Sequence, residues 1–213
     1  WLLFAKERRV LRAKGDRLHR VRHVAETLAL SEPPSPELWL RPEHEMAALE
    51  HLPNGVPVLA LGPTANWGGK QWPIERFAAL ARRLTASDGP LPNARVAVFG
   101  AANERSAAQP LLDDLPSEQV IDLIGRIELP VVLACLRRCD LFVGNDSGLM
   151  HMAAAAPIPT LGLFGPSREE LYSPWGEMAA AVRTDRSFDD IRNDPAYDYR
   201  KQDSWMITLP VEK

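Results

Sequence analysis

The chain has 213 residues, of which 46% are hydrophobic and 25% are charged. This composition is ordinary for a globular protein with enough apolar material for a core, and the length allows one large domain or one domain with parts of another. The formal net charge of −3 argues against a nucleic-acid-binding domain, which usually carries a basic surplus that neutralises phosphates. No apolar segment approaches the roughly 20 residues that are needed to span a bilayer.

Residues 1–30 are predicted to form a basic helix. Residues 1–23 contain eight Lys or Arg and only two acids, Glu7 and Asp16. Two interpretations stay open: a solvated helix face, or a surface that faces an anionic membrane. The proline-rich stretch at residues 31–43 predicts a stiff linker, because proline restricts the backbone and forbids helix.

The middle of the chain alternates between apolar runs and amphipathic stretches. Strands are expected at residues 56–62, 94–100, 119–125, 141–145 and 160–165, and helices at residues 73–84, 104–115, 129–139 and 147–156. Strands separated by helices of about ten residues predict a parallel sheet covered on both faces. The fold class is therefore α/β, a Rossmann-like doubly wound sheet. Residues 187–204 are polar and are expected to be irregular.

The two cysteines, Cys135 and Cys139, lie four residues apart. One such pair without a nearby histidine makes a poor zinc site. We therefore expect two buried thiols that pack as small apolar side chains.

Polar loops follow three of the predicted strands, at Gly62–Gln71, Gly100–Glu104 and Asn145–Gly148. Ligands of doubly wound sheets bind beyond the carboxyl ends of the strands. In the third loop Asp146 or Ser147 is expected to cap the helix. The free N–H groups of its first turn and the helix dipole favour a phosphate, although a plain N-cap explains the same residues.

The first loop adds a cation. It reads GPTANWGGKQW, with a hydroxyl at Thr64 and an ammonium at Lys70. It is not a Walker A loop, because six residues separate Gly62 from Gly69 and Gln71 follows the lysine. We therefore expect a diphosphate between Lys70 and the helix that begins near Ser147, rather than an NTPase site.

The residues that carry these loops resemble glycosyltransferase family 9, the ADP-heptose:lipopolysaccharide heptosyltransferases. The likeness rests on the lysine loop before Trp72-Pro73, on the run NDSGLMHMAAAA, and on PTLGLFGP, which starts at Pro159. It covers about Val56 to Pro174. The sequence departs from the family pattern at Ser147, where threonine is usual, and at Gly62-Pro63, where Pro-Gly is common.

The resemblance implies the GT-B architecture, in which two Rossmann-like halves hold a sugar nucleotide between them. Residues 43–186 would be the C-terminal donor-binding half. Residues 1–42 would be the tail of a missing N-terminal domain with its linker, and residues 187–213 an irregular C-terminal segment. We accordingly expect the sequence to be cut at both ends.

The resemblance also implies roles for residues at the phosphate. Thr64 and Lys70 would contact the diphosphate, and Lys70 would neutralise the leaving group. Ser147 and Gly148 would supply backbone N–H groups. Asp146 would orient donor-sugar hydroxyls or the helix turn, so that Lys70 and Asp146 are the predicted catalytic residues of this chain.

A second group would contact the nucleoside. Glu104 is expected to meet the ribose, and Ile127, Glu128 and Leu129 to line the adenine. His151 lies one turn into the helix, where it either points into the site or is a core histidine bonded to the backbone.

The reaction implied is inverting transfer of a heptose from an ADP-sugar to a lipid-linked lipopolysaccharide core acceptor, on the cytoplasmic side of the bacterial inner membrane with peripheral contact to it. No metal is expected, because the sequence lacks Asp-x-Asp and Lys70 with the helix dipole can take the place of a cation. The general base would lie in the missing half, so the chain should bind donor without turning it over. Two alternatives remain: a sugar-nucleotide epimerase of the same architecture and a non-catalytic sugar-nucleotide-binding module.

Overall fold

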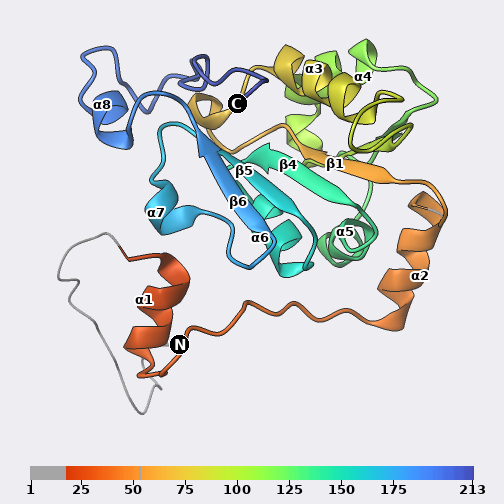
Figure 1. The fold of residues 1–213 in the computed structure, drawn as a ribbon, viewed down its shortest axis with the longest axis horizontal. Coiled ribbons are helices and arrows are strands. Elements are labelled where there is room, and N and C mark those ends of the chain that lie inside the picture. The colour runs from red at the N-terminus through yellow and green to blue at the C-terminus, as the bar shows by residue number, and fades with distance from the viewer. Residues whose placement is uncertain (1–17, 53) are drawn as a thin grey trace.

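The structure, a computed structural model, describes residues 18–52 and 54–213. Most of the basic N-terminal segment therefore lies outside the described residues. Its described end forms helix α1, Arg20–Thr27, which an extended linker connects to the rest of the molecule (Figure 1). His19 hydrogen-bonds the Ser173 carbonyl oxygen at 2.9 Å and stacks on Trp175. This helix thus packs on the loop that precedes the last strand.

Six parallel strands form one sheet in the order β3-β2-β1-β4-β5-β6. Their bounds are β1 Val58–Gly62, β2 Arg95–Val98, β3 Val120–Asp122, β4 Leu141–Asn145, β5 Thr160–Phe164 and β6 Ala179–Arg183. All five residues of β1 are buried, as expected for a central strand with both faces covered. The doubly wound α/β sheet predicted from the sequence is confirmed, with β6 as an additional edge strand.

Helices cover both faces of the sheet (Figure 1). α3 and α4 pack together on one face, and α2, α5 and α6 pack on the other. α7 and α8 are short and lie in the C-terminal third. The bounds are α2 Pro42–His51, α3 Ile74–Thr85, α4 Arg105–Asp114, α5 Leu129–Leu136, α6 Gly148–Ala155, α7 Glu169–Tyr172 and α8 Phe188–Arg192.

Each face of the sheet has its own apolar core. Phe142, Phe164 and the α5 side chains form the core under α2, α5 and α6. Leu59, Leu61 and Phe77 form the core under α3 and α4. The second core also contains Met206 and Leu209, which are fully buried although they belong to the segment after α8. The C-terminal segment is therefore part of the packed molecule.

Cys135 and Cys139 are free thiols buried beside α5, as predicted. Burial raises the pKa of the Cys135 thiol to about 11, and burial also raises the pKa of Cys139. A buried thiol stays protonated because the apolar surroundings disfavour the thiolate.

Candidate functional site

The order of the strands places the two loops that are expected to bind phosphate side by side. β1 and β4 are neighbours, and the order of the sheet reverses between them. Loops that leave the carboxyl ends of such a pair diverge to opposite faces and open a crevice. The Lys70 loop leaves β1, and Asp146 and Ser147 leave β4, so the predicted residues meet at this point of the fold.

Lys70 and Asp146 form an ion pair. A single turn of 3-10 helix, Gly68–Lys70, ends the first loop and carries the lysine. The Lys70 ammonium donates to Asp146 Oδ2 at 2.6 Å, where 26% of the lysine side chain and 8% of the aspartate side chain are exposed. An ammonium has three N–H donors, so two remain for another acceptor.

The N-terminus of α6 differs from the expected cap. Ser147 takes the N-cap position, but the structure, over the residues it describes, gives its hydroxyl no capping bond. Asp146 bonds Lys70 instead. The expectation that one of these side chains caps the helix is therefore wrong. The amides of the first turn are left for another acceptor.

All ten residues predicted for the site line one cavity of about 940 Å³. Part of its wall is apolar, with Val132 and Met152 beside the predicted adenine residues. Of the described residues that line it, Lys70 is the only Lys or Arg. The predicted residues brought together here are Thr64, Lys70, Glu104, Ile127, Glu128, Leu129, Asp146, Ser147, Gly148 and His151.

Two hydroxyls in the cavity wall have no hydrogen-bond partner among the described residues. Thr64 is 2% exposed, and neither its Oγ1 nor the buried Oγ of Ser147 is bonded. Buried hydroxyls usually find a partner, because a lost hydrogen bond is not replaced by water there. Both residues line the cavity, so a small rotation of either side chain would let its hydroxyl donate to an acceptor bound there.

Gly148 leaves the cavity open at the helix end. A Cβ placed on this glycine would have no heavy atom within 4 Å. The backbone at the first turn of α6 therefore faces free space, which a ligand can approach closely.

The far wall of the cavity is built from the loops after β2 and β3. Glu104 Oε2 accepts from the Ala101 N–H at 2.7 Å, which fixes the carboxylate at the cavity edge. Gly125 N–H donates to the Gly100 carbonyl oxygen at 2.9 Å and joins the two loops. Gly125 has φ +64°, and a Cβ there would lie 2.5 Å from the Ala102 backbone, so this junction requires glycine.

The environment of His151 lowers the pKa of its imidazole. Partial desolvation by the surrounding protein is the main cause, although the residue stays exposed to solvent; the Asp146 carboxylate opposes it, and the His19 and Lys70 charges act in the same direction as desolvation. The side chain lines the cavity, which agrees with the first of the two interpretations left open by the sequence.

Asn145 holds the two sides of the site together, and its side chain was not predicted from the sequence. It is fully buried at the end of β4. Its Nδ2 donates to the Pro63 carbonyl oxygen at 2.8 Å, and its Oδ1 accepts from the Trp72 N–H at 3.0 Å. One side chain therefore fixes both ends of the Lys70 loop. A polar residue that ends an apolar strand was the available signal.

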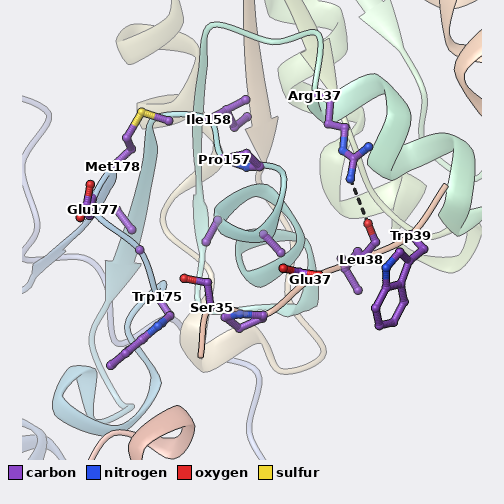
Figure 2. A pocket seen from close by; sticks show the side chains of 15 residues that line it. Ser35, Glu37, Leu38, Trp39, Arg137, Pro157, Ile158, Trp175, Glu177 and Met178 are labelled. Carbon is purple, nitrogen blue, oxygen red and sulfur yellow. Dashed lines mark hydrogen bonds between the residues drawn. The ribbon is translucent and has the colours of Figure 1, made fainter. Parts of the chain in front are cut away.

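A second cavity, of about 650 Å³, lies at the amino ends of β5 and β6, away from the carboxyl ends that carry the first cavity. Figure 2 shows it between the linker residues Ser35 to Trp39 and the turns that precede β5 and β6. Arg137 holds the linker here by donating to the Leu38 carbonyl oxygen at 2.9 Å. This cavity contains none of the predicted site residues.

Within residues 18–52 and 54–213, no three histidine, cysteine or acidic side chains are grouped as a metal site would require. No helix in the same residues is long and apolar enough to cross a membrane.

The comparisons with known proteins point to one family. The family model for glycosyltransferase family 9 (heptosyltransferase) matches residues 2–194. Lipopolysaccharide heptosyltransferase 2 of Salmonella typhimurium is 31% identical over 186 residues, which are 81% of this chain and 51% of that protein. Lipopolysaccharide heptosyltransferase 1 of Pseudomonas aeruginosa is 32% identical over 133 residues, which are 62% of this chain and 35% of that protein.

Solved structures share the fold. The family 9 glycosyltransferase of Veillonella parvula superposes with a TM-score of 0.77 at 23% identity, over 94% of this chain and 59% of that one. The ADP-heptose lipopolysaccharide heptosyltransferase II of E. coli gives 0.68 at 24% identity, over 87% and 53%. The chain spans 35% to 59% of the length of these relatives. Since the family model covers most of the sequence, this chain belongs to glycosyltransferase family 9, the heptosyltransferases.

Proposed function

We propose that this chain is the donor-binding half of a heptosyltransferase that transfers a heptose from an ADP-sugar to a lipopolysaccharide core acceptor. In this proposal residues 43–186 bind the sugar nucleotide, residues 1–42 end a preceding domain, and residues 187–213 complete the C-terminal side. The observation that carries the proposal is the meeting of the Lys70 ammonium with the uncapped start of α6 in one cavity.

The diphosphate would lie between these two positive groups. The dipole of α6 adds about half a positive charge at its N-terminus, and the free amides there bind phosphate oxygens. Thr64 and Ser147 would donate their unpartnered hydroxyls to the same oxygens. Asp146 would hold the ammonium at the cavity wall and orient hydroxyls of the sugar. These groups stabilise the charge that grows on the departing diphosphate as the glycosidic bond breaks.

The nucleoside would occupy the far end of the cavity. One carboxylate oxygen of Glu104 is bonded to the backbone, and the other would accept from a ribose hydroxyl. Ile127, Glu128 and Leu129 would line the adenine. The E. coli heptosyltransferase WaaC, which matches this fold with a TM-score of 0.59, was solved with ADP.

The acceptor side would come from outside this chain. Deprotonating the acceptor hydroxyl requires a general base, which we place in the half of the family architecture that precedes these residues. The chain would then bind donor and not turn it over alone. The complete enzyme would work at the cytoplasmic face of the inner membrane, on a lipid-linked oligosaccharide.

Titration calorimetry of ADP against the 213-residue chain tests the donor site. We expect saturable 1:1 binding, weakened at least ten-fold by Lys70→Met, because a charge-assisted contact to phosphate contributes about 1.5–3 kcal/mol. Lys213→Met, which removes an exposed lysine paired with Asp185, is the matched control and should bind as wild type does. Undetectable binding to wild type, or unchanged binding with Lys70→Met, would contradict the proposal.

Removing Lys70 leaves the Asp146 carboxylate buried without a partner, which destabilises the fold. The double variant Lys70→Met with Asp146→Asn removes both charges and separates the two effects. It should melt close to wild type while ADP binding stays weak.

The epimerase alternative has lost support, because the family and the curated relatives named above are transferases. A product assay with the complete enzyme still distinguishes the two. A free epimerised sugar nucleotide formed without acceptor would point to the epimerase.

A further inference from the structure

The segment Lys201–Leu209, here called the C-terminal strap, lies across the turn that carries Lys70. Gln202 Oε1 accepts from the Gly68 N–H at 2.7 Å. The Trp205 N–H donates to the Gly69 carbonyl oxygen at 3.0 Å. Ser204 Oγ donates to the Gln71 carbonyl oxygen at 2.5 Å. These hydrogen bonds hold the backbone on both sides of the lysine.

The strap and the turn are in close contact. A Cβ on Gly68 would lie 2.3 Å from the Gln202 carbonyl oxygen, and a Cβ on Gly69 would lie 2.4 Å from the Trp67 ring. Neither contact can be relieved without moving backbone or a large ring. Gly68 thus allows the strap to pack directly on the turn, and Gly69 allows the Trp67 ring to lie against it.

The far end of the strap is anchored independently of the turn. Met206 and Leu209 are buried in the core under α3. The Trp72 Nε1–H donates to the Leu209 carbonyl oxygen at 2.8 Å, and Arg76 donates to the same oxygen. The strap can therefore transmit a fixed position from the core to the turn.

The turn has little stability of its own. Its backbone bonds are Lys70 N–H to the Trp67 carbonyl oxygen and Gln71 N–H to the Gly68 carbonyl oxygen, and short 3-10 turns have poor hydrogen-bond geometry. A loop that must be ordered when its ligand binds loses affinity, because the ordering entropy opposes binding. Fixing the turn in advance avoids that loss at Lys70.

We propose that Gln202 and Ser204 are positioning residues, which hold the Lys70 ammonium where it meets the diphosphate of the donor. The proposal rests on the proposed function, because it assigns the strap to the same phosphate site. Gln202 and Ser204 do not line the cavity. Under this proposal they nevertheless set the affinity for a nucleoside diphosphate and leave the affinity for a nucleoside monophosphate unchanged.

The test compares ADP and AMP binding by calorimetry in Gln202→Met, which removes the acceptor oxygen and keeps the length of the side chain. ADP affinity should fall about ten-fold, the size of one lost positioning hydrogen bond, while AMP affinity stays within two-fold. Ser204→Ala should behave in the same way, and Ser204→Thr, which keeps the hydroxyl, should restore ADP affinity. Thermal unfolding of each variant monitors the fold.

Introducing Gln202→Met into the Lys70→Met background shows whether the strap acts through the lysine. If it does, the second substitution lowers ADP affinity no further. Equal losses of ADP and AMP affinity, an additional loss in the Lys70→Met background, or wild-type binding in both strap variants would overturn the proposal and leave the donor site intact. Wild-type protein that does not bind ADP would overturn both proposals.

Discussion

Single polar groups without a partner locate the phosphate site within the cavity. The Thr64 and Ser147 hydroxyls are buried and have no hydrogen-bond partner among the described residues. The Lys70 ammonium donates to Asp146, which leaves two of its three N–H groups for another acceptor. Such groups weaken a folded protein slightly, because burial removes their bonds to water. A bound phosphate would supply the missing hydrogen-bond acceptors. Because these acceptors are charged, the new hydrogen bonds would be stronger than neutral ones, so the same hydroxyls would favour binding.

Thr64→Val should separate these two effects. Valine has nearly the shape of threonine and removes only the unpartnered hydroxyl, so the free energy of unfolding should be unchanged or slightly higher. ADP affinity should fall about ten-fold, because a hydrogen bond to a charged acceptor is lost. Urea unfolding and calorimetry measure the two quantities. A clear loss of stability would mean that the hydroxyl has a structural partner.

Gly148→Ala should also weaken binding without harming the fold. The new methyl group meets no atom of the protein, and alanine is a better helix former than glycine by about 1 kcal/mol. The melting temperature should stay the same or rise. The methyl group would occupy the space in which a phosphate approaches the backbone, so ADP affinity should fall at least ten-fold. Wild-type affinity would place the phosphate elsewhere.

His151 should make stability depend on pH in the acid range. The folded protein lowers the pKa of the imidazole from its ordinary value of 6.5, chiefly by partly desolvating a residue that remains exposed to solvent. The unfolded chain then binds more protons, so the free energy of unfolding falls as pH drops below about 6.5 and levels off below the lowered pKa. Urea unfolding between pH 7.5 and 5 should show a shallower decline in His151→Gln. Equal slopes in the two proteins would contradict this assignment.

At the scale of elements, the sequence was most informative where strands were apolar throughout. β1, β4 and β5 are almost entirely buried, and the polar residues that follow β1 and β4 mark the site. β6 was missed because an edge strand rich in alanine, AAAVR, has no strong apolar pattern. α6 was predicted, but the capping bond was not formed because Asp146 pairs with a lysine from a loop 76 positions away. Local spacing cannot reveal such a partner.

Asn145 joins β4 to the Lys70 loop, and its loss should be costly. Asn145→Ala leaves the Pro63 carbonyl and the Trp72 N–H without their bonds in a buried place. Each unsatisfied group costs about 1–3 kcal/mol, so the free energy of unfolding should fall by about 2–6 kcal/mol. Asn193→Ala, at an exposed position after α8, is the control and should change it by less than about 0.5 kcal/mol. A loss below 1 kcal/mol in Asn145→Ala would show that the bridge is dispensable.

At the scale of the whole molecule, the site could be predicted because the strand order of the sheet places loops that are distant in sequence next to each other. Lys70 and Asp146 belong to different crossovers, and only the reversal of strand order between β1 and β4 brings them together. The Gly125 junction and the strap could not be predicted. Both depend on contacts between segments whose sequences carry no periodic pattern.

The absence of a metal requirement remains a prediction of the whole site. Lys70 and the α6 dipole supply the positive charge that a divalent cation provides in other nucleotide sites. ADP affinity should therefore be the same within two-fold in 5 mM EDTA and in 5 mM Mg²⁺, measured by calorimetry with the ionic strength matched. A ten-fold gain with Mg²⁺ would show that the cation is part of the site.

Residues 201–209 are synthesised more than a hundred residues after the lysine turn that they hold in place. Until residues 201–209 have been synthesised, the lysine turn lacks the hydrogen bonds that hold its backbone. A chain that stopped just after α8 would therefore contain all six strands, but it would lack both the contacts that hold the lysine turn and the core residues Met206 and Leu209. Substitutions in residues 201–209 should accordingly impair donor capture, even though none of these residues lines the cavity.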